Sequence, residues 1–310
     1  MFNFKPMSKT FTSTVPPSLK KGDQVAIVAT ARYADLKILE FAEQLLESWG
    51  LKLNRGKNLL KKHYNFAGND AERLEDLQRA MDHPELKAIF CFRGGYGSTR
   101  ILEKIEAKKF MNSPKWVIGF SDVTALHNYI GTICNTASVH ATMPINYKDN
   151  SDNALRSLKQ LLFEKTMNYC IDSCAENILG QASGPIVGGN LAILQSLSGT
   201  KYDINTKGKI LFIEDVDEYL YNIDRMLWTL QHAGKLANLA GLIVGGFTQL
   251  KDNDDPFGMT VQQIILEKVK AYHYPVCFNF PSGHFNDNCA LGLNLPVKLI
   301  VGSEKVELSN

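Results

Sequence analysis

The chain has 310 residues, of which 45% are hydrophobic and 21% charged, as in an ordinary globular protein of one large or two modest domains. A formal net charge of +2 provides no broad basic surface for nucleic acid. No apolar run approaches the roughly 20 residues that span a bilayer, and residues 1–19 lack the apolar stretch of a signal peptide. We therefore expect a cytoplasmic protein without nucleic-acid or membrane partners.

Strands and helices alternate through the first half of the chain. Apolar runs predict strands at 25–29, 51–53, 86–92 and 116–119. Amphipathic spacing predicts helices at 34–49, 70–81, 98–105 and 123–134. This alternation is typical of a doubly wound parallel sheet, so the predicted class is α/β.

The second half of the chain is less regular. Residues 148–183 contain one predicted helix, 154–163, and otherwise form a connection. Beyond Gly184, helices are predicted at 191–197, 222–233 and 260–271, and strands at 209–213, 242–244, 276–280, 298–301 and 305–308. We therefore expect an N-terminal domain at 15–147, a connecting segment at 148–183 and a mixed α/β domain at 184–310.

A glycine-rich turn, Arg93-Gly94-Gly95-Tyr96-Gly97, follows the predicted strand 86–92. Ligands bind at the carboxyl edge of parallel strands, where such turns gather. The bare backbone amides suit an oxyanion hole or a phosphate site. The turn lacks the lysine of a P-loop and the spacing of a dinucleotide fingerprint. A plain strand-to-helix turn is the alternative.

Ser121 lies at the corner between the strand 116–119 and the helix 123–134. A serine at such a corner is a candidate nucleophile, although Val123 occupies the position of the second glycine in the hydrolase motif G-x-S-x-G. The competing interpretation is that Ser121 or Asp122 caps the helix, which is the commoner role of these residues.

Four acids in five residues, Glu214 to Glu218, follow the strand 209–213. Three interpretations are open for this run: a solvated turn, a Mg²⁺ or Ca²⁺ site, or a site in which Glu214 orients a catalytic histidine. Among seven histidines, His284 stands out because it follows Gly283 in a loop after a predicted strand. The six cysteines include no CxxC pair, so reduced thiols are expected.

These segments, taken together, resemble the LD-carboxypeptidase family and its relatives, the microcin C self-immunity peptidases. The resemblance extends from Gly22 to about Pro296. The motifs that carry it, in order, are Phe66-Ala67-Gly68-Asn69-Asp70-Ala71-Glu72-Arg73, Arg93-Gly94-Gly95-Tyr96-Gly97, Gly119-Phe120-Ser121-Asp122, Gly188-Gly189-Asn190-Leu191, Phe212-Ile213-Glu214-Asp215, Ile223-Asp224-Arg225-Met226-Leu227 and Gly283-His284.

The resemblance implies a serine peptidase in which Ser121 is the nucleophile, Glu214 the orienting acid and His284 the base. It implies oxyanion donors among the amides of Gly94, Gly95 and Asp122, and a substrate contact at Asn190. We add Arg225 as a candidate for attracting the substrate's free carboxylate. The implied fold is a flavodoxin-like N-terminal domain with a smaller α/β C-terminal domain of barrel-like character, in a homodimer that needs no cofactor or metal.

The expected reaction is hydrolysis of an L,D-amide bond, with release of terminal D-alanine from a murein tetrapeptide during cell-wall recycling. One alternative is a microcin-type immunity peptidase that cleaves a peptidyl-nucleotide conjugate. Another is a non-catalytic two-domain protein that binds a small ligand. The chain departs from the family pattern at 29–32, Ala-Thr-Ala-Arg, and at 290–293, Ala-Leu-Gly-Leu, so the exact substrate stays open.

Overall fold

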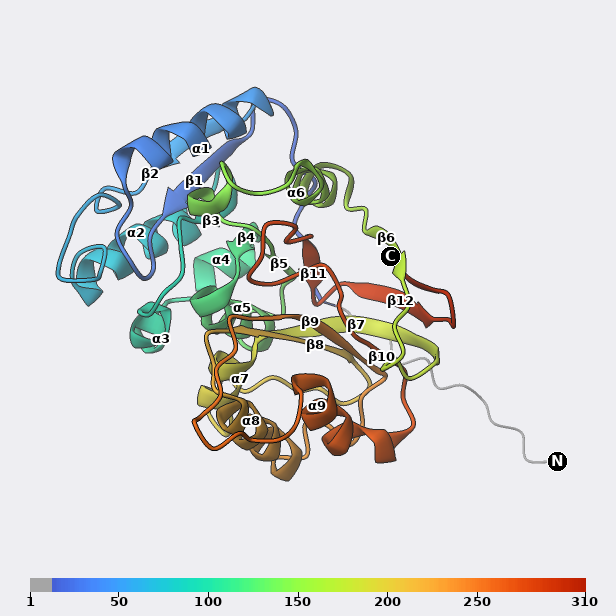
Figure 1. Ribbon diagram of the computed structural model, residues 1–310. Helices are drawn as coiled ribbons and strands as arrows, with labels where there is room; N and C mark the ends of the chain where they lie inside the picture. Colours follow the sequence, from blue (N-terminus) through green and yellow to red (C-terminus); the bar gives the residue numbers. More distant parts are fainter. Residues whose placement is uncertain (1–12) are drawn as a thin grey trace.

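The computed structural model describes residues 13–310 and shows one open, mostly parallel sheet with helices on its faces (Figure 1). The strands are β1 (Gln24–Val28), β2 (Lys52–Arg55), β3 (Leu86–Cys91), β4 (Trp116–Gly119), β5 (Ser138–His140), β6 (Asn168–Asp172), β7 (Gly180–Asn190), β8 (Ile210–Val216), β9 (Gly241–Thr248), β10 (Val276–Cys277), β11 (Leu291–Leu293), β12 (Pro296–Val301) and β13 (Lys305–Ser309). The α-helices are α1 (Leu36–Ser48), α2 (Asp70–Asp82), α3 (Ser98–Ile101), α4 (Lys108–Asn112), α5 (Thr124–Thr132), α6 (Asp152–Glu164), α7 (Leu191–Ser196), α8 (Leu220–His232) and α9 (Val261–Val269). Short 3₁₀ turns are η1 (Leu102–Lys104), η2 (Ser121–Val123), η3 (Pro144–Asn146) and η4 (Lys270–Tyr272).

The N-terminal half is doubly wound, as the alternation of elements predicts. Strands β2, β1, β3, β4 and β5 lie side by side in that order and are parallel. Successive residues of β1 face opposite sides, so Val25 and Ile27 pack with α1 while Ala26 and Val28 pack with α2. Both faces are covered, which explains why β1 and β3 are almost wholly apolar.

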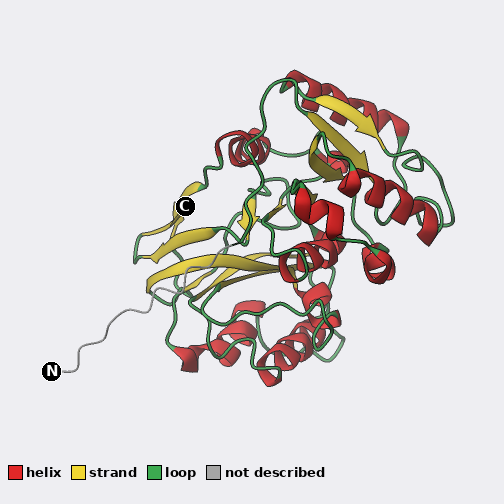
Figure 2. Ribbon diagram, turned by 180° about the vertical axis from the view of Figure 1, so that it is seen from behind, coloured by secondary structure: helices red, strands yellow, loops and turns green. Residues whose placement is uncertain are grey.

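The C-terminal half continues the same sheet. Strands β7, β8, β9 and β10 are parallel, and helices α7, α8 and α9 cover one face (Figures 1 and 2). The short strand β11 pairs with both β5 and β7 and so joins the two halves. Strands β12, β13 and β6 extend β7 in antiparallel fashion. Among residues 13–310 the sheet is not closed, because β2 and β10 remain as its edges, so the barrel-like character expected of this half is not found.

Several elements differ from the expectations. Residues 148–183, predicted as mostly a connection, contain β6 and the start of β7 besides α6. Strands β5 and β11 are three residues each and therefore carry too little periodicity to be found. Strand β8 continues beyond residue 213 and includes two buried acids, Glu214 and Asp215. No apolar run signals that extension, because two acids interrupt it before Val216.

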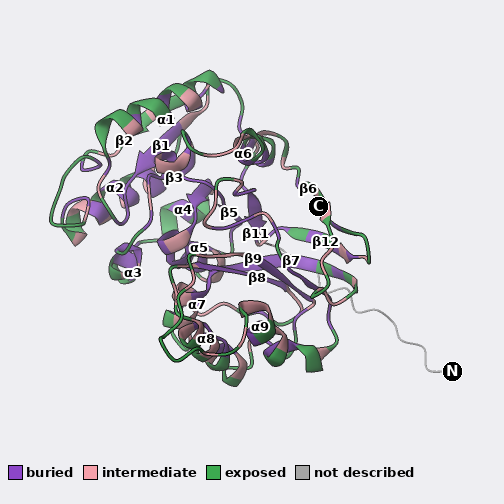
Figure 3. Cartoon of the chain, in the orientation of Figure 1, coloured by how far each residue is buried: buried purple, intermediate pink, exposed green. Residues whose placement is uncertain are grey.

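Burial follows the layers, with the inner strands buried, the edge strands β2 and β6 largely exposed, and the outer helix faces exposed (Figure 3). Within residues 13–310, no helix has the length and apolarity needed to cross a membrane. The expectations for residues 1–12 lie outside the described residues. The carboxyl ends of β1, β3, β4 and β8 bring together the turns that the sequence singles out, and these turns form the candidate site.

Candidate active site

Ser121 lies at a sharp corner between β4 and α5, in the 3₁₀ turn η2. Its φ is +61°, a left-handed conformation that non-glycine residues seldom adopt. Such strain is typical of a nucleophile held at a strand-to-helix elbow. The side chain of Ser121 makes no capping hydrogen bond, and neither does any other residue at the start of η2 or α5. The helix-cap interpretation of Ser121 is therefore wrong.

The glycine turn after β3 lies directly against Ser121. A Cβ built on Gly94 would lie 3.0 Å from Ser121 Cβ and 3.4 Å from the amide nitrogen of Asp122, so a side chain here would crowd the serine. Gly95 has a φ of +110°, which favours glycine. The amides of Gly94, Gly95 and Asp122 have no acceptor within residues 13–310. Free amides beside a serine oxygen are the donors that an oxyanion hole needs.

The carboxylate of Asp122 holds the glycine turn in place. It accepts hydrogen bonds from the amides of Gly97, at 3.3 Å, and Ser98, at 2.9 Å. Asp122 is buried, and this burial raises the pKa of its carboxyl group. Asp122 therefore caps the start of α3, not its own helix, and ties the turn after β3 to the elbow after β4.

His284 and Glu214 form a hydrogen-bonded pair at the end of β8. Nδ1 of His284 lies 2.6 Å from Oε2 of Glu214, whose side chain is fully buried. Burial alone lowers the pKa of His284, but the charge and hydrogen bond of Glu214 outweigh it and raise that pKa. The bond uses Nδ1 and leaves Nε2 as the ring nitrogen available for proton transfer.

The imidazole ring of His284 contacts the ring of Phe120, the residue before Ser121. The two rings pack with centroids 4.8 Å apart. No direct hydrogen bond joins Ser121 to His284; such bonds are often long before substrate binds. His140 of β5, which the sequence analysis did not select, lies beneath them against Phe120 and Phe212. Its buried ring nitrogens have no hydrogen-bond partner among residues 13–310, and burial lowers its pKa well below the ordinary value, which favours the neutral ring.

The acids of the run 214–218 have separate partners. Glu214 binds His284, whereas Asp215 accepts from Asn190 Nδ2 at 2.8 Å and from the amide of Ala192 at 2.9 Å. Asp217 pairs with Lys251 and Glu218 with Asn222. Across residues 13–310 no three acid, histidine or cysteine side chains are placed to hold a metal ion. Of the four acids, Glu214 is the one hydrogen-bonded to His284. This agrees with the interpretation that Glu214 orients a catalytic histidine.

Comparison with known proteins identifies the family. Residues 25–141 match the LD-carboxypeptidase N-terminal domain, and residues 183–299 match the LD-carboxypeptidase C-terminal domain. The chain belongs to the LD-carboxypeptidase family. It is 36% identical over 89% of its length, and 88% of the relative's, to a probable murein peptide carboxypeptidase of Bacillus subtilis.

Solved structures of LD-carboxypeptidase relatives share the fold. Muramoyltetrapeptide carboxypeptidase from Oxalobacter formigenes superposes with a TM-score of 0.85 at 27% identity, over 92% of this chain and 98% of that one. MccF in complex with glutamyl sulfamoyl guanosine gives a TM-score of 0.85 at 18% identity, over 96% of this chain and 98% of that one, which indicates a common fold.

Two further positions predicted to bind substrate have structural contacts in this LD-carboxypeptidase. Asn190 caps α7 by accepting from the amide of Ile193 at 3.2 Å and also donates to Asp215. Arg225 is exposed on α8, where it donates to Asn222 and stacks on Tyr221 at 5.4 Å from the ring centroid. A substrate contact at either residue stays a prediction.

We expect Asn190→Ala to lower the free energy of unfolding by about 1–2 kcal/mol, because a helix cap and a buried hydrogen bond to Asp215 are lost together. Denaturant unfolding of the variant and the parent measures this difference. An unchanged unfolding free energy would show that these two bonds contribute nothing to folding.

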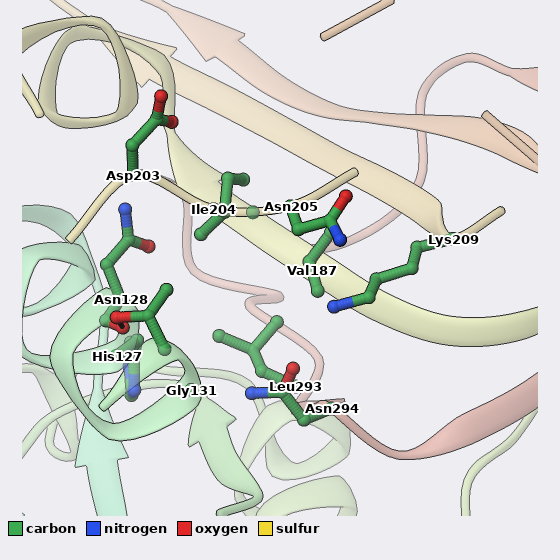
Figure 4. A pocket seen from close by; sticks show the side chains of 12 residues that line it. His127, Asn128, Gly131, Val187, Asp203, Ile204, Asn205, Lys209, Leu293 and Asn294 are labelled. Atoms are coloured by element: carbon green, nitrogen blue, oxygen red, sulfur yellow. Dashed lines mark hydrogen bonds between the residues drawn. The ribbon is translucent and has the colours of Figure 1, made fainter. Parts of the chain in front are cut away.

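A separate cavity of about 290 Å³ lies between α5 and β7 (Figure 4). His127, Asn128, Val187 and Lys209 are among its lining residues, and none of Ser121, Glu214 and His284 is. The candidate catalytic residues therefore lie outside this cavity, at the elbow after β4 and the end of β8.

Proposed function

We propose that this chain is a serine-type LD-carboxypeptidase in which Ser121, His284 and Glu214 act as nucleophile, base and orienting acid. One observation carries the proposal. A buried carboxylate holds the histidine by Nδ1, and that histidine packs on Phe120, the residue before a strained serine whose neighbouring amides have no acceptor within residues 13–310. The non-catalytic binding protein considered as an alternative has no need for this combination.

In the proposed reaction, Nε2 of His284 removes the proton of Ser121 Oγ as the oxygen attacks the scissile carbonyl carbon. The amides of Gly94 or Gly95, together with Asp122, bind the resulting oxyanion. Glu214 keeps the imidazole in the required tautomer and stabilises its protonated form. The imidazolium then protonates the leaving amine, and a water molecule hydrolyses the acyl-enzyme with His284 again acting as the base.

The proposed substrate is a murein tetrapeptide, from which the enzyme releases terminal D-alanine. The names of the B. subtilis and O. formigenes relatives, which refer to murein peptides and a muramoyltetrapeptide, support this choice. We further propose that the protein acts in the cytoplasm, in cell-wall recycling, and as a homodimer.

Incubating the protein with a murein tetrapeptide and, separately, with a peptidyl-nucleotide conjugate tests this proposal. Mass spectrometry of the products should show a tripeptide and free D-alanine from the first substrate. Cleavage of the conjugate alone would assign the protein to the immunity-peptidase activity, and cleavage of neither would favour the binding-protein alternative.

Hydrolysis should survive treatment with EDTA, because the acids of the run 214–218 have separate protein partners and do not converge on one point. The measurement is the initial rate of D-alanine release before and after chelation. Loss of activity with EDTA, restored by Mg²⁺ or Zn²⁺, would contradict the proposed mechanism.

A further inference from the structure

Two arginines at the site have no negatively charged partner. Arg32 follows β1, and Arg93 follows β3, so both lie at the carboxyl edge of neighbouring strands. Neither guanidinium group forms an ion pair or a hydrogen bond within residues 13–310. By contrast, Arg73 and Arg100, which lie nearby on α2 and α3, share the carboxylate of Asp70.

Arg32 and Arg93 follow the paired ends of two adjacent strands, since Val28 of β1 lies opposite Cys91 of β3. Burial lowers the pKa of Arg93, and the positive charge of Arg32 lowers it further. Arg93 is half-buried and Arg32 is exposed. Two like charges in partly desolvated surroundings repel one another, and an anion bound between them would relieve that repulsion.

The position of Arg32 relates the pair to the reaction centre. Its Cδ and Nε lie 2.7 Å from the point where a Cβ of Gly95 would be, so this side chain covers the glycine turn. The neighbouring Gly94 is the residue that touches Ser121. Arg32 therefore lies against the glycine turn that carries the free amides, and Arg93 directly precedes that turn in the chain.

A carboxypeptidase substrate places a carboxylate in this region. Three covalent bonds separate the carboxyl carbon of the terminal amino acid from the scissile carbonyl carbon, so the two carbons are within about 4 Å of each other. A group that binds this carboxylate must therefore adjoin the oxyanion site. Guanidinium groups bind carboxylates through two parallel hydrogen bonds, which fixes orientation as well as charge.

We propose that Arg32 and Arg93 bind the free carboxylate of the terminal D-amino acid and thereby restrict this enzyme to substrates with an unblocked C-terminus. The inference rests on the proposed hydrolysis of an L,D-amide bond. It also places the carboxylate site at these two arginines and not at Arg225, which is already bound to Asn222 and stacked on Tyr221.

The test compares two substrates, a murein tetrapeptide ending in D-alanine and the same peptide ending in D-alanine amide. For the parent enzyme, kcat/KM for the acid should exceed that for the amide by about 50- to 100-fold, the effect of a charge-assisted hydrogen-bonded pair. Arg93→Gln should remove this preference by lowering only the rate for the acid, with the amide rate within about 3-fold of the parent. Arg93→Lys should keep part of the preference, because the charge remains but the planar fork is lost.

Arg32→Gln provides an independent variant, since its exposed side chain forms no ion pair or hydrogen bond within residues 13–310, and it should reduce the preference by about 10-fold. Arg156→Gln, a change of an exposed arginine on α6 with no contact to the site, is the matched control and should leave both rates unchanged. Should Arg93→Gln fail to fold, the acid-to-amide ratio of Arg32→Gln decides the question.

Two outcomes would overturn the assignment. Equal losses on acid and amide in the Arg32 and Arg93 variants would indicate a structural role, and loss of the preference in Arg225→Gln alone would move the carboxylate to α8. If the proposed function itself is wrong, the parent enzyme will release neither D-alanine nor D-alanine amide. That result would also remove the assignment of the carboxylate site.

Discussion

Replacing Ser121 with alanine should reduce the release of D-alanine by about 10⁴- to 10⁶-fold, because the nucleophile, base and orienting acid act as one unit. The substitution removes a single oxygen and leaves the amides of Gly94, Gly95 and Asp122 in place. Substrate should therefore still bind. The measurements are the turnover rate with murein tetrapeptide and the dissociation constant of the inactive variant, by calorimetry.

Folding stability should hardly change in Ser121→Ala. The side chain of Ser121 caps no helix, so we expect a change in the free energy of unfolding of less than about 0.5 kcal/mol, as for substitutions that remove no specific contact. Ser196→Ala, on the exposed side of α7, is the matched control and should retain full activity. A Ser121→Ala enzyme that turned over near the parent rate would eliminate the serine mechanism.

Replacing Glu214 with glutamine should lower kcat by about 10³- to 10⁴-fold while preserving the shape of the site. Glutamine is nearly isosteric, but it carries no charge to stabilise the imidazolium and can hold the ring in the wrong tautomer. Asp217→Asn, in the same acidic run but paired with Lys251 at the surface, is the matched control and should leave kcat unchanged. Equal effects of the two changes would remove Glu214 from its orienting role.

The pH profile provides a second test of the same pair. The base must be unprotonated, and Glu214 raises the pKa of His284 above its ordinary value of 6.5. The acid limb of kcat/KM in the parent should therefore have its midpoint above pH 6.5. In Glu214→Gln, burial, which lowers that pKa, is opposed only by the smaller effect of the Asp215 charge, so the residual activity should persist to lower pH. A midpoint that does not move would show that another group controls the limb.

Local patterns are sufficient to predict much of this molecule. The alternation of apolar strands and amphipathic helices predicts the doubly wound N-terminal half, because both signals arise within ten to fifteen residues of chain. The positions of the Ser121 elbow and the glycine turn follow from the same strands, which end just before them. The patterns do not predict β5, β11 or the end of β8, because these segments are short or contain acids. They form because neighbouring strands pair with them, not because of their own sequence.

The sequence by itself determined the order of elements, the family and the residues available for chemistry. It left open whether Ser121 was a cap and which acid of the run 214–218 faced the histidine. Tertiary structure decided both, because β8 buries Glu214 against a histidine 70 residues away while the neighbouring acids find other partners. It also placed Arg32 and Arg93 at the ends of adjacent strands, without an ion-pair partner for either within residues 13–310. Such pairings depend on which strands lie side by side, a long-range property that no local propensity encodes.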